Sequence, residues 1–182
     1  IIGMILGDAF LQKTGKKNAR IRLEHSEKQK DYLIWKASFF SEFFQGKPRF
    51  LERFNPYYQK KYRYVRWQSN SSPEIGKIQK IFYKQVRKRI PNNLLSLFND
   101  PLSLAIWYMD DGYLYHRDKM IYIYLPKYTA EEQKILLKTL RENFELKPIL
   151  KTKKGNQVLI FSFKETKKFL SLVKPFIIPS MR

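Results

Sequence analysis

The 182-residue sequence contains no cysteine. This excludes disulfide bonds and thiolate metal sites, and it fits a reducing compartment. Long apolar runs are also missing: none approaches the roughly 20 residues that span a bilayer, so we expect no membrane partner. Acidic residues are scarce, because 16 Asp and Glu stand against 36 Lys and Arg, and the formal net charge is +20. The length suits one domain or two small packed halves.

Positive charge and aromatic residues are what the chain has in excess. A field of this strength attracts polyanions, so nucleic acid is the expected partner. Aromatic residues make up 16% of the chain, and in residues 57–67 they are interleaved with basic ones. Rings that stack on bases would then lie beside cations that bind phosphate. The alternative for this segment is a packed strand with solvated lysines.

The start and the composition of the chain bear on its origin. It begins at Ile1 without a basic-then-apolar leader, so we expect a trimmed fragment whose targeting segment is not visible. Its richness in Lys, Ile, Asn, Tyr and Phe indicates an AT-rich coding genome. We therefore expect an intracellular location, either the matrix of a mitochondrion or chloroplast or a microbial cytoplasm.

Two adjacent carboxylates, Asp110 and Asp111, end the apolar run SLAIWYM. Asp100 and Pro101 predict the start of a helix there, and Gly112 predicts a left-handed stop. Both aspartates would then lie at the negative end of the helix dipole, where each further negative charge costs about 0.3–1 kcal/mol. A solvated helix end or Lys and Arg partners could explain them. The alternative is a divalent cation, which prefers carboxylate oxygens.

The predicted order of elements repeats along the chain. Residues 1–7 predict a helix, followed by a hairpin (10–28), a helix (29–44), a hairpin (49–70) and a helix (72–87). A connector helix (92–98) precedes the second set: a helix (101–111), strands (113–127), a helix opened by a Thr129–Glu132 capping box, a hairpin (148–163) and a helix (165–173). We therefore expect an α+β fold of two pseudo-symmetric αββαββα halves, residues 1–98 and 99–182.

The duplication turns one acidic helix end into two. Residues 1–9 align with residues 104–112, which brings Asp8 onto Asp111. If the two helices pack side by side, two carboxylates meet, and like charges raise each other's pKa unless a cation lies between them. Paired carboxylates that hold divalent metal beside a basic surface are the parts of a phosphodiester-cleaving site.

These two nine-residue segments resemble the paired motifs of the LAGLIDADG homing endonucleases, in particular the single-chain members that carry both motifs. The resemblance covers nearly all 182 residues. It implies that the motif helices form the interface between the halves, and that the acids at the eighth motif position, Asp8 and Asp111, bind Mg²⁺. Mn²⁺ would substitute, and Ca²⁺ would support binding without cleavage. Asp110, at the seventh position, would play a supporting part.

Further site residues follow from the same resemblance. His25 falls where the family carries a polar residue that positions solvent, with Pro126 as its counterpart in the second half. A surface histidine at a strand end is the alternative. Lys88 is the candidate for the basic residue near the metals. One departure from the family is the pair Ile106 and Tyr108, which are large for a close helix crossing, although Gly3 and Gly7 on the other helix leave room.

The resemblance also implies that each half's curved antiparallel sheet lies in the DNA major groove. Side chains alternate between the two sides of a strand, so only every second residue of each strand can face the DNA. The strand bases and amides expected to contact DNA are Arg20, Arg22, Lys61, Arg63, Arg66, Gln68, Lys151, Lys153 and Gln157.

The implied function is Mg²⁺-dependent cleavage of both strands of a long asymmetric DNA site. The products would carry 3′ overhangs, and the enzyme would be a monomer encoded in an intron or intein-like mobile element. Two rivals stay open. One is a splicing maturase of the same fold that binds its host intron RNA. The other is a basic nucleic-acid-binding module whose metal site has decayed, against which the intact Asp8 and Asp111 argue.

Overall fold

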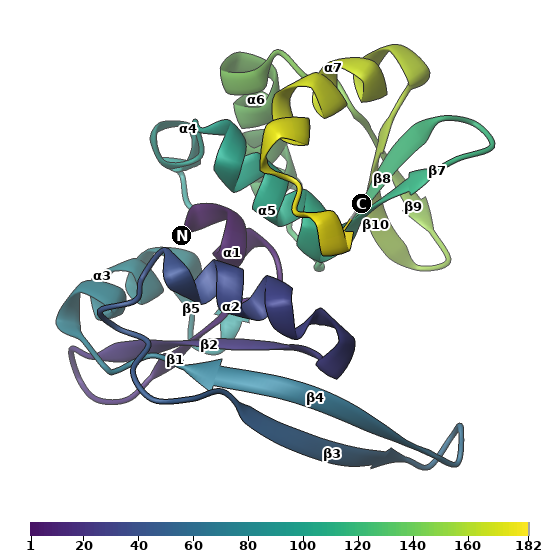
Figure 1. The fold of residues 1–182 in the computed structure, drawn as a ribbon. Coiled ribbons are helices and arrows are strands. Elements are labelled where there is room, and N and C mark those ends of the chain that lie inside the picture. Colours follow the sequence, from purple (N-terminus) through teal and green to yellow (C-terminus); the bar gives the residue numbers. More distant parts are fainter. Residues whose placement is uncertain (182) are drawn as a thin grey trace. The chain divides into compact units, whose positions relative to one another are not determined.

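The computed structural model describes residues 1–181 and contains two four-stranded antiparallel sheets, one from each half of the sequence (Figure 1). The strand orders are β1-β2-β4-β3 and β7-β8-β10-β9, so both sheets have the same topology. The predicted α+β class with repeated αββαββα order is confirmed. Within residues 1–181, no helix combines the length and the apolar character needed to cross a membrane.

The first half runs from the first motif helix to a short connector. Its elements are α1 (Ile2–Leu6), β1 (Phe10–Lys13), β2 (Ala19–Ser26), α2 (Lys30–Ser38), β3 (Arg49–Asn55), β4 (Lys60–Gln68), α3 (Pro73–Phe82), β5 (Tyr83–Lys84), β6 (Arg87–Lys88) and α4 (Leu94–Leu97).

The second half repeats this order from the second motif helix onward. Its elements are α5 (Pro101–Asp111), β7 (Gly112–Tyr115), β8 (Met120–Leu125), α6 (Ala130–Phe144), β9 (Ile149–Lys153), β10 (Asn156–Phe161) and α7 (Phe163–Val173). The 3₁₀ turns are η1 (Glu27–Gln29), η2 (Lys174–Phe176) and η3 (Pro179–Met181).

The chain forms two compact units whose bounds differ from the sequence halves. The first unit joins Ile1–Gly7 to Phe82–Ile177, and the second unit joins Asp8–Ile81 to the residues from Ile178 onward. Helix α1 therefore belongs to the unit that is built mainly from the second half. The division at residues 98 and 99 stays a prediction about the duplication.

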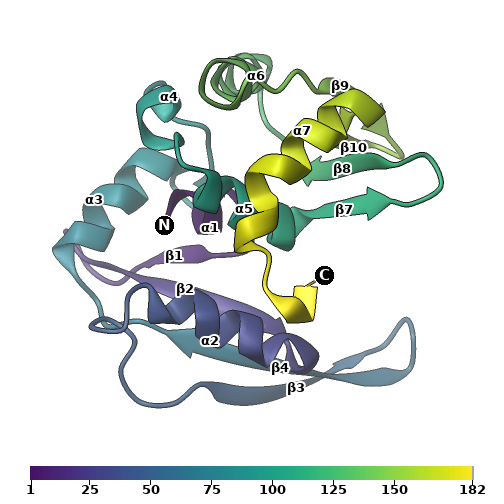
Figure 2. The ribbon, with the colours of Figure 1, turned by 45° about the horizontal axis from the view of Figure 1, so that its top comes forward.

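In the first unit, α5 and α7 pack on one face of the β7–β10 sheet (Figure 2). The core between them is apolar: Phe161 and Phe169 are both fully buried. The rings of Phe161 and Phe169 lie edge to face with centroids 4.9 Å apart, a favourable aromatic geometry. The opposite face of this sheet is left open by the described helices of the unit.

In the second unit, α2 packs on β2 and β4. Strand β2 alternates strictly between buried and half-exposed residues, and its buried positions include Ile21 and Leu23. Tyr32 and Leu33 of α2 are fully buried as well. This period-2 pattern leaves the side chains between the buried ones on the face away from α2.

The predicted bounds of α5, residues 101–111, are confirmed, but the left-handed stop predicted at Gly112 is wrong. The Asp100 carboxylate accepts a hydrogen bond of 2.8 Å from the Ser103 amide, and Pro101 opens the helix. Gly112 is extended, with φ −100° and ψ 159°, and not left-handed. The reason is that Gly112 is already the first residue of β7, paired with Ile123, so the chain passes from helix to strand without a turn.

Two predicted helices are shorter than expected. The helix at 29–44 ends at Ser38 and continues as hydrogen-bonded turns, in which the Phe43 amide donates to the Phe40 carbonyl. The helix at 72–87 ends at Phe82, and residues 83–88 form a small hairpin that turns at Gln85 with a positive φ of 57°. Tertiary contacts described below override the helical periodicity there. The Thr129–Glu132 capping box is confirmed.

Candidate active site and nucleic-acid interface

Helices α1 and α5 pack against each other within the first unit, as the sequence predicted. Glycine makes this crossing possible. A Cβ atom on Gly3 would overlap the backbone carbonyl of Ser103, and one on Gly7 would overlap the carboxylate of Asp110. The large Tyr108 ring does not obstruct the crossing, because it lies against Phe169 of α7 with centroids 5.3 Å apart.

Asp8 follows the end of α1 and is the first residue of the second unit. Its carboxylate oxygen Oδ2 lies 3.7 Å from Nδ1 of His25, on β2. The His25 side chain is 3% exposed and packs on the Tyr32 ring, whereas the Asp8 side chain is 45% exposed. His25 is thus a fixed group beside a carboxylate that remains accessible to a cation.

Asp111 is the last residue of α5 and is half-buried. Near it lies Tyr128, a buried residue that is not among the predicted site residues. Burial raises the pKa of the Tyr128 hydroxyl, and the negative charges of Asp111 and Glu132 raise it further. The hydroxyl therefore stays protonated beside Asp111. The only sequence signal for it is its position just before the Thr129 cap. Whether Asp8 and Asp111 share a metal stays a prediction.

The two halves differ at the position of His25. Phe10, two residues after Asp8, pairs with Arg22, and Tyr113, two residues after Asp111, pairs with Tyr122. This register aligns His25 with Leu125. The expected counterpart, Pro126, is therefore wrong by one residue, because the turn between β7 and β8 is shorter than the turn between β1 and β2.

Lys88 lies on β6, where its ammonium group donates a hydrogen bond to the carbonyl oxygen of Gly7. Gly7 caps the end of α1 and precedes Asp8 in the chain. A cation at this carbonyl is favourable because the C-terminal end of a helix carries partial negative charge. Lys88 thus places a positive charge at the peptide group that leads into Asp8.

The register of the first sheet assigns a face to each of its predicted DNA contacts. Arg22 pairs with Gln68, and Arg20 lies on the same side of β2 as Arg22. These residues and Arg66 therefore share the face away from α2, which we call the open face of the first sheet. Its residues are Phe10, Gln12, Arg20, Arg22, Glu24, Ser26, Arg49, Leu51, Arg53, Asn55, Lys60, Tyr62, Tyr64, Arg66 and Gln68. Lys61 and Arg63 alternate with these residues along β4, so they lie on the opposite face of the sheet, as Val65 does.

Several open-face cations are held by neighbours on the same face. Arg20 donates to the side chain of Gln12 at 3.0 Å, and the Arg22 guanidinium lies over the Phe10 ring at 4.8 Å. Glu24 accepts from Arg66 at 2.5 Å. Burial acts to raise the pKa of Glu24, but hydrogen bonds and charge from Arg53 and Arg66 outweigh it, and the net pKa is lowered.

The second sheet has an open face of different chemistry. Lys151 pairs with Val158, which pairs with Tyr124, so these residues share the face away from α5 and α7. Three tyrosine rings stack there: Tyr113 lies 5.4 Å from Tyr122 and 6.3 Å from Tyr124. The Lys153 ammonium lies 5.0 Å from the Tyr122 ring centre.

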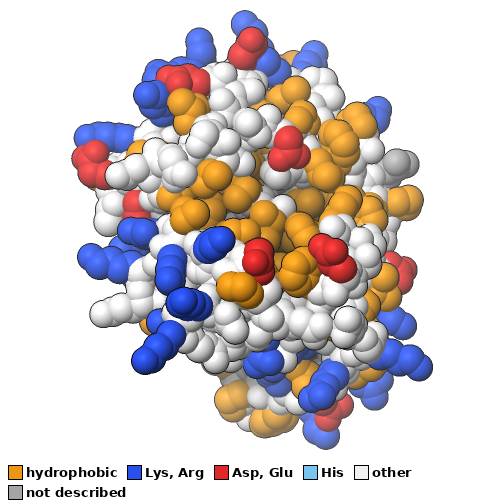
Figure 3. All heavy atoms as spheres, turned by 90° about the vertical axis from the view of Figure 1, so that its left-hand side faces the viewer, with side chains coloured by type: hydrophobic (Ala, Val, Ile, Leu, Met, Phe, Trp, Pro, Cys, Tyr) orange, Lys and Arg blue, Asp and Glu red, His pale blue; other side chains and the backbone are white. Residues whose placement is uncertain are grey.

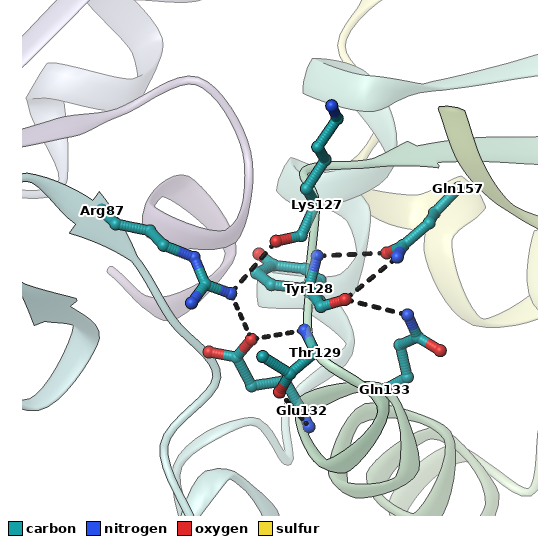
Figure 4. Close-up of polar contacts among 7 residues, drawn as sticks. All are labelled: Arg87, Lys127, Tyr128, Thr129, Glu132, Gln133 and Gln157. Atoms are coloured by element: carbon teal, nitrogen blue, oxygen red, sulfur yellow. Dashed lines mark hydrogen bonds and ion pairs between the residues drawn. The ribbon is translucent and has the colours of Figure 1, made fainter. Parts of the chain in front are cut away.

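The Gln157 side chain lies on the face of the sheet that α5 and α7 cover, because Gln157 pairs with Leu125. Its side-chain amide donates to the Tyr128 carbonyl at 3.0 Å, and its side-chain oxygen accepts from the Tyr128 amide at 3.1 Å (Figure 4). Gln157 thus holds the loop between β8 and α6. The role in DNA binding predicted for it and for the other strand residues stays a prediction.

Basic residues are not confined to the two open faces. On the face drawn in Figure 3, Lys and Arg side chains project from many separate places, with Asp and Glu side chains among them. The basic side chains Lys134, Lys138 and Arg141 also line a groove along α6. The charge of +20 is therefore distributed widely over the chain.

Three features together define a protein of the homing-endonuclease class. They are the repeated αββαββα halves, the glycine-lined crossing of two motif helices that lead into aspartates, and the open basic sheet faces. The chain belongs to the LAGLIDADG DNA endonuclease family, whose family model matches residues 1–169.

Individual relatives agree with this membership. The chain is 29% identical to a probable intron-encoded endonuclease 1 of Wickerhamomyces canadensis, over all of this chain and 80% of that protein. It is similar to the structure of the homing endonuclease I-WcaI bound to its DNA recognition sequence, with 28% identity and a TM-score of 0.88, covering 99% of this chain and 81% of that one.

Two other kinds of relative carry different names. Protein RecA of Mycobacterium shimoidei is 30% identical over all of this chain, but the chain spans only 44% of RecA's length. A cytochrome b mRNA maturase bI2 of Debaryomyces hansenii is 26% identical over 99% of this chain and 70% of that protein.

Proposed function

We propose that this chain is a metal-dependent, site-specific endonuclease that hydrolyses one phosphodiester bond in each strand of a long asymmetric DNA site. The observation that carries the proposal is the packing of α1 on α5 through Gly3 and Gly7, in a chain of the LAGLIDADG DNA endonuclease family. Each of these helices leads into an aspartate of the eighth motif position, Asp8 or Asp111.

The aspartates have the chemistry that a hard divalent cation requires. Their ligand atoms are carboxylate oxygens, the Asp8 side chain is accessible, and Mg²⁺ and Mn²⁺ both suit such ligands. A bound cation would stabilise charge on the attacking and leaving oxygens of the phosphate. We infer that Mg²⁺ is the working ion, that Mn²⁺ substitutes, and that Ca²⁺ supports binding alone.

The remaining side chains position the reaction. His25, fixed on Tyr32, orients the Asp8 carboxylate and the solvent near it in the first half. The protonated Tyr128 hydroxyl lies near Asp111 in the second half, which carries Leu125 in place of the histidine. Lys88 supplies positive charge beside the first motif helix. Asp110 packs on Gly7 and supports the crossing.

The open sheet faces suit the DNA duplex. Guanidinium groups on the first sheet can donate to guanine acceptors and to phosphates, and the tyrosines and lysines of the second sheet can contact base edges and phosphates. We infer that one chain binds one duplex as a monomer and leaves 3′ overhangs, and that it is encoded in an intron or intein-like mobile element within an organelle or a microbe.

The test is cleavage of a randomised-site plasmid library in Mg²⁺, followed by sequencing of all double-strand ends. A single long site with 3′ overhangs is expected. On that site, Asp8→Asn and Asp111→Asn should abolish double-strand cleavage but retain DNA affinity in Ca²⁺, because phosphate contacts come from the sheets. Asp110→Asn should be milder. Wild-type cleavage by Asp8→Asn would overturn the proposed metal site.

Maturase activity is the second candidate, favoured by the Debaryomyces hansenii relative. An RNA splicing role needs specific binding to structured intron RNA, which shape and single-stranded loops dominate. Tight binding of the host intron RNA, combined with no cleavage of the intron-free DNA site, would favour this candidate over the endonuclease.

A further inference from the structure

The hairpin that carries Lys88 is too small to fix its own position. It consists of two paired strands of two residues each, in which Tyr83 pairs with Lys88 and Lys84 with Arg87. Val86, at the turn, is 83% exposed. A two-stranded hairpin of this size is not stable alone in water. Contacts outside the hairpin must therefore determine where the Lys88 ammonium lies.

Arg87 provides such a contact (Figure 4). Its Nη2 atom donates to Oε2 of Glu132 at 2.6 Å and to the carbonyl oxygen of Lys127 at 3.1 Å. Both acceptors belong to the start of α6 and the loop before it. Figure 4 shows the guanidinium reaching from the hairpin to this loop, beside the Tyr128 ring.

Glu132 is a fixed partner. Its carboxylate also accepts from the Thr129 amide at 2.7 Å, as part of the α6 capping box. Its side chain is 12% exposed. Burial acts to raise the pKa of Glu132, but the hydrogen bonds from Thr129 and the charge of Arg87 outweigh it. The bond from the Thr129 amide also fixes the position of the carboxylate that Arg87 binds.

Consecutive residues of a strand point to opposite sides. Arg87 points to α6 and its neighbour Lys88 points to α1, where it binds the Gly7 carbonyl. Fixing one side chain of the strand therefore fixes the direction of the other. An ion pair whose arginine is half-exposed contributes little to the free energy of unfolding. Its effect on the position of a catalytic charge can be much larger, because misplacement by about 1 Å can cost about 100-fold in rate.

We propose that Arg87 is a positioning residue, which through Glu132 and the Lys127 carbonyl holds the β5–β6 hairpin so that the Lys88 ammonium stays at the end of α1 beside the scissile phosphate. This inference rests on the proposed endonuclease function and on the role of Lys88 in it. It adds a link from the β8–α6 loop of the second half to the charge that serves the first motif.

The experiment measures single-turnover cleavage of the selected site at saturating protein, with DNA affinity in Ca²⁺ and thermal unfolding measured separately. Arg87→Gln and Glu132→Gln should each lower the cleavage rate about 10–100-fold, with affinity changed less than about twofold. Arg87→Lys should restore part of the rate. Amide hydrogen exchange of residues 83–88 should become faster in Arg87→Gln.

The decisive measurement is the cleavage rate of a protein that carries both substitutions. In a Lys88→Met background, Arg87→Gln should cause no further loss, because Arg87 acts through Lys88. Two controls separate position from charge and from stability. Lys84→Gln removes one charge from the same hairpin and should keep the rate. Thr129→Ala removes the cap hydroxyl, should lower the thermal unfolding temperature by about 2–4 °C, and should also keep the rate.

The experiment distinguishes a wrong role for Arg87 from a wrong function for the protein. If wild type cuts and Lys88→Met does not, but Arg87→Gln cuts at the wild-type rate, Arg87 does not position Lys88. If Arg87→Gln lowers affinity in parallel with rate, or adds to the loss in Lys88→Met, Arg87 acts directly on DNA and the inference is wrong. A wild-type protein that cuts no duplex in the library overturns the endonuclease function, and the inference with it.

Discussion

Gly3 and Gly7 set how closely α1 and α5 approach, because each lies where a Cβ atom would overlap an atom of α5. Gly3 faces a backbone carbonyl, which cannot turn away as a side chain can. The contact therefore depends on the absence of a single methyl group. Gly15 offers a matched comparison, since no heavy atom lies within 4 Å of the position its Cβ would take.

Gly3→Ala should lower the free energy of unfolding by about 1–3 kcal/mol, the usual cost of forcing a methyl group into a packed interior. Gly15→Ala should leave stability unchanged or raise it by up to about 1 kcal/mol, because it restricts the unfolded chain without a clash. Urea unfolding of both variants checks this. Equal stability of the two would show that the helix crossing relaxes freely.

His25 distinguishes the two halves at the level of one residue, because the sheet register aligns it with Leu125. His25→Leu should therefore slow the cleavage of one DNA strand by about 10–100-fold and leave the other nearly unchanged. Strand-specific end labels should reveal a nicked intermediate that accumulates. If both strands slow equally, His25 serves the whole site and not one half of it.

At the scale of elements, the two sheets share a topology but differ in surface chemistry. The open face of the first sheet is rich in arginine, whereas that of the second carries a stack of tyrosines. The alternation of side chains along the strands divides the predicted DNA contacts between the two faces of the sheet. Arg22 lies on the open face. Arg63 lies on the opposite face, where its Nε atom is 3.7 Å from Oε2 of Glu52. The two residues carry equal charge but lie on opposite faces of the sheet.

Arg22→Gln should weaken DNA binding in Ca²⁺ and lower the slope of log K against log salt by about one unit, as expected for a lost phosphate contact. Arg63→Gln should leave this slope nearly unchanged. Affinity measured at several salt concentrations gives both slopes. If Arg63→Gln lowers the slope and Arg22→Gln does not, the sheet presents its other face to the duplex.

At the scale of the whole molecule, the net charge of +20 should dominate the interaction with DNA. If about six to ten phosphates are neutralised, log K for the wild type should fall with log salt at a slope of roughly −5 to −9. Titrations of a labelled duplex in Ca²⁺ over a range of salt concentrations measure it. A slope near zero would exclude binding through the basic sheet faces.

Both motifs lie in one chain, and their helices α1 and α5 pack within one unit of that chain. The protein should therefore sediment as a monomer of 22.0 kDa and cut an asymmetric site. Sedimentation equilibrium with and without DNA checks the mass. A stable homodimer that cuts only palindromic sites would contradict the internal duplication.

Local sequence chemistry predicted most of the elements, and the failures share one cause. The caps at Asp100 and Thr129 were predictable because their bonds join residues only three positions apart. The hairpin at 83–88 was not, since its sequence continues a helical pattern. Its strands are fixed by Arg87 bonds to residues 40 and 45 positions away, which no local pattern contains.

The sequence by itself determined the duplication, the two motif segments that lead into Asp8 and Asp111, the αββαββα order and the basic charge, because these depend on spacing, periodicity and composition. Only the tertiary structure decided which residues of each strand lie on the open face of the sheet, which residue aligns with His25, and that Tyr128 lies near Asp111. The physical reason is that register and burial arise from contacts between segments far apart in the chain, whereas caps and periodicity arise from neighbours.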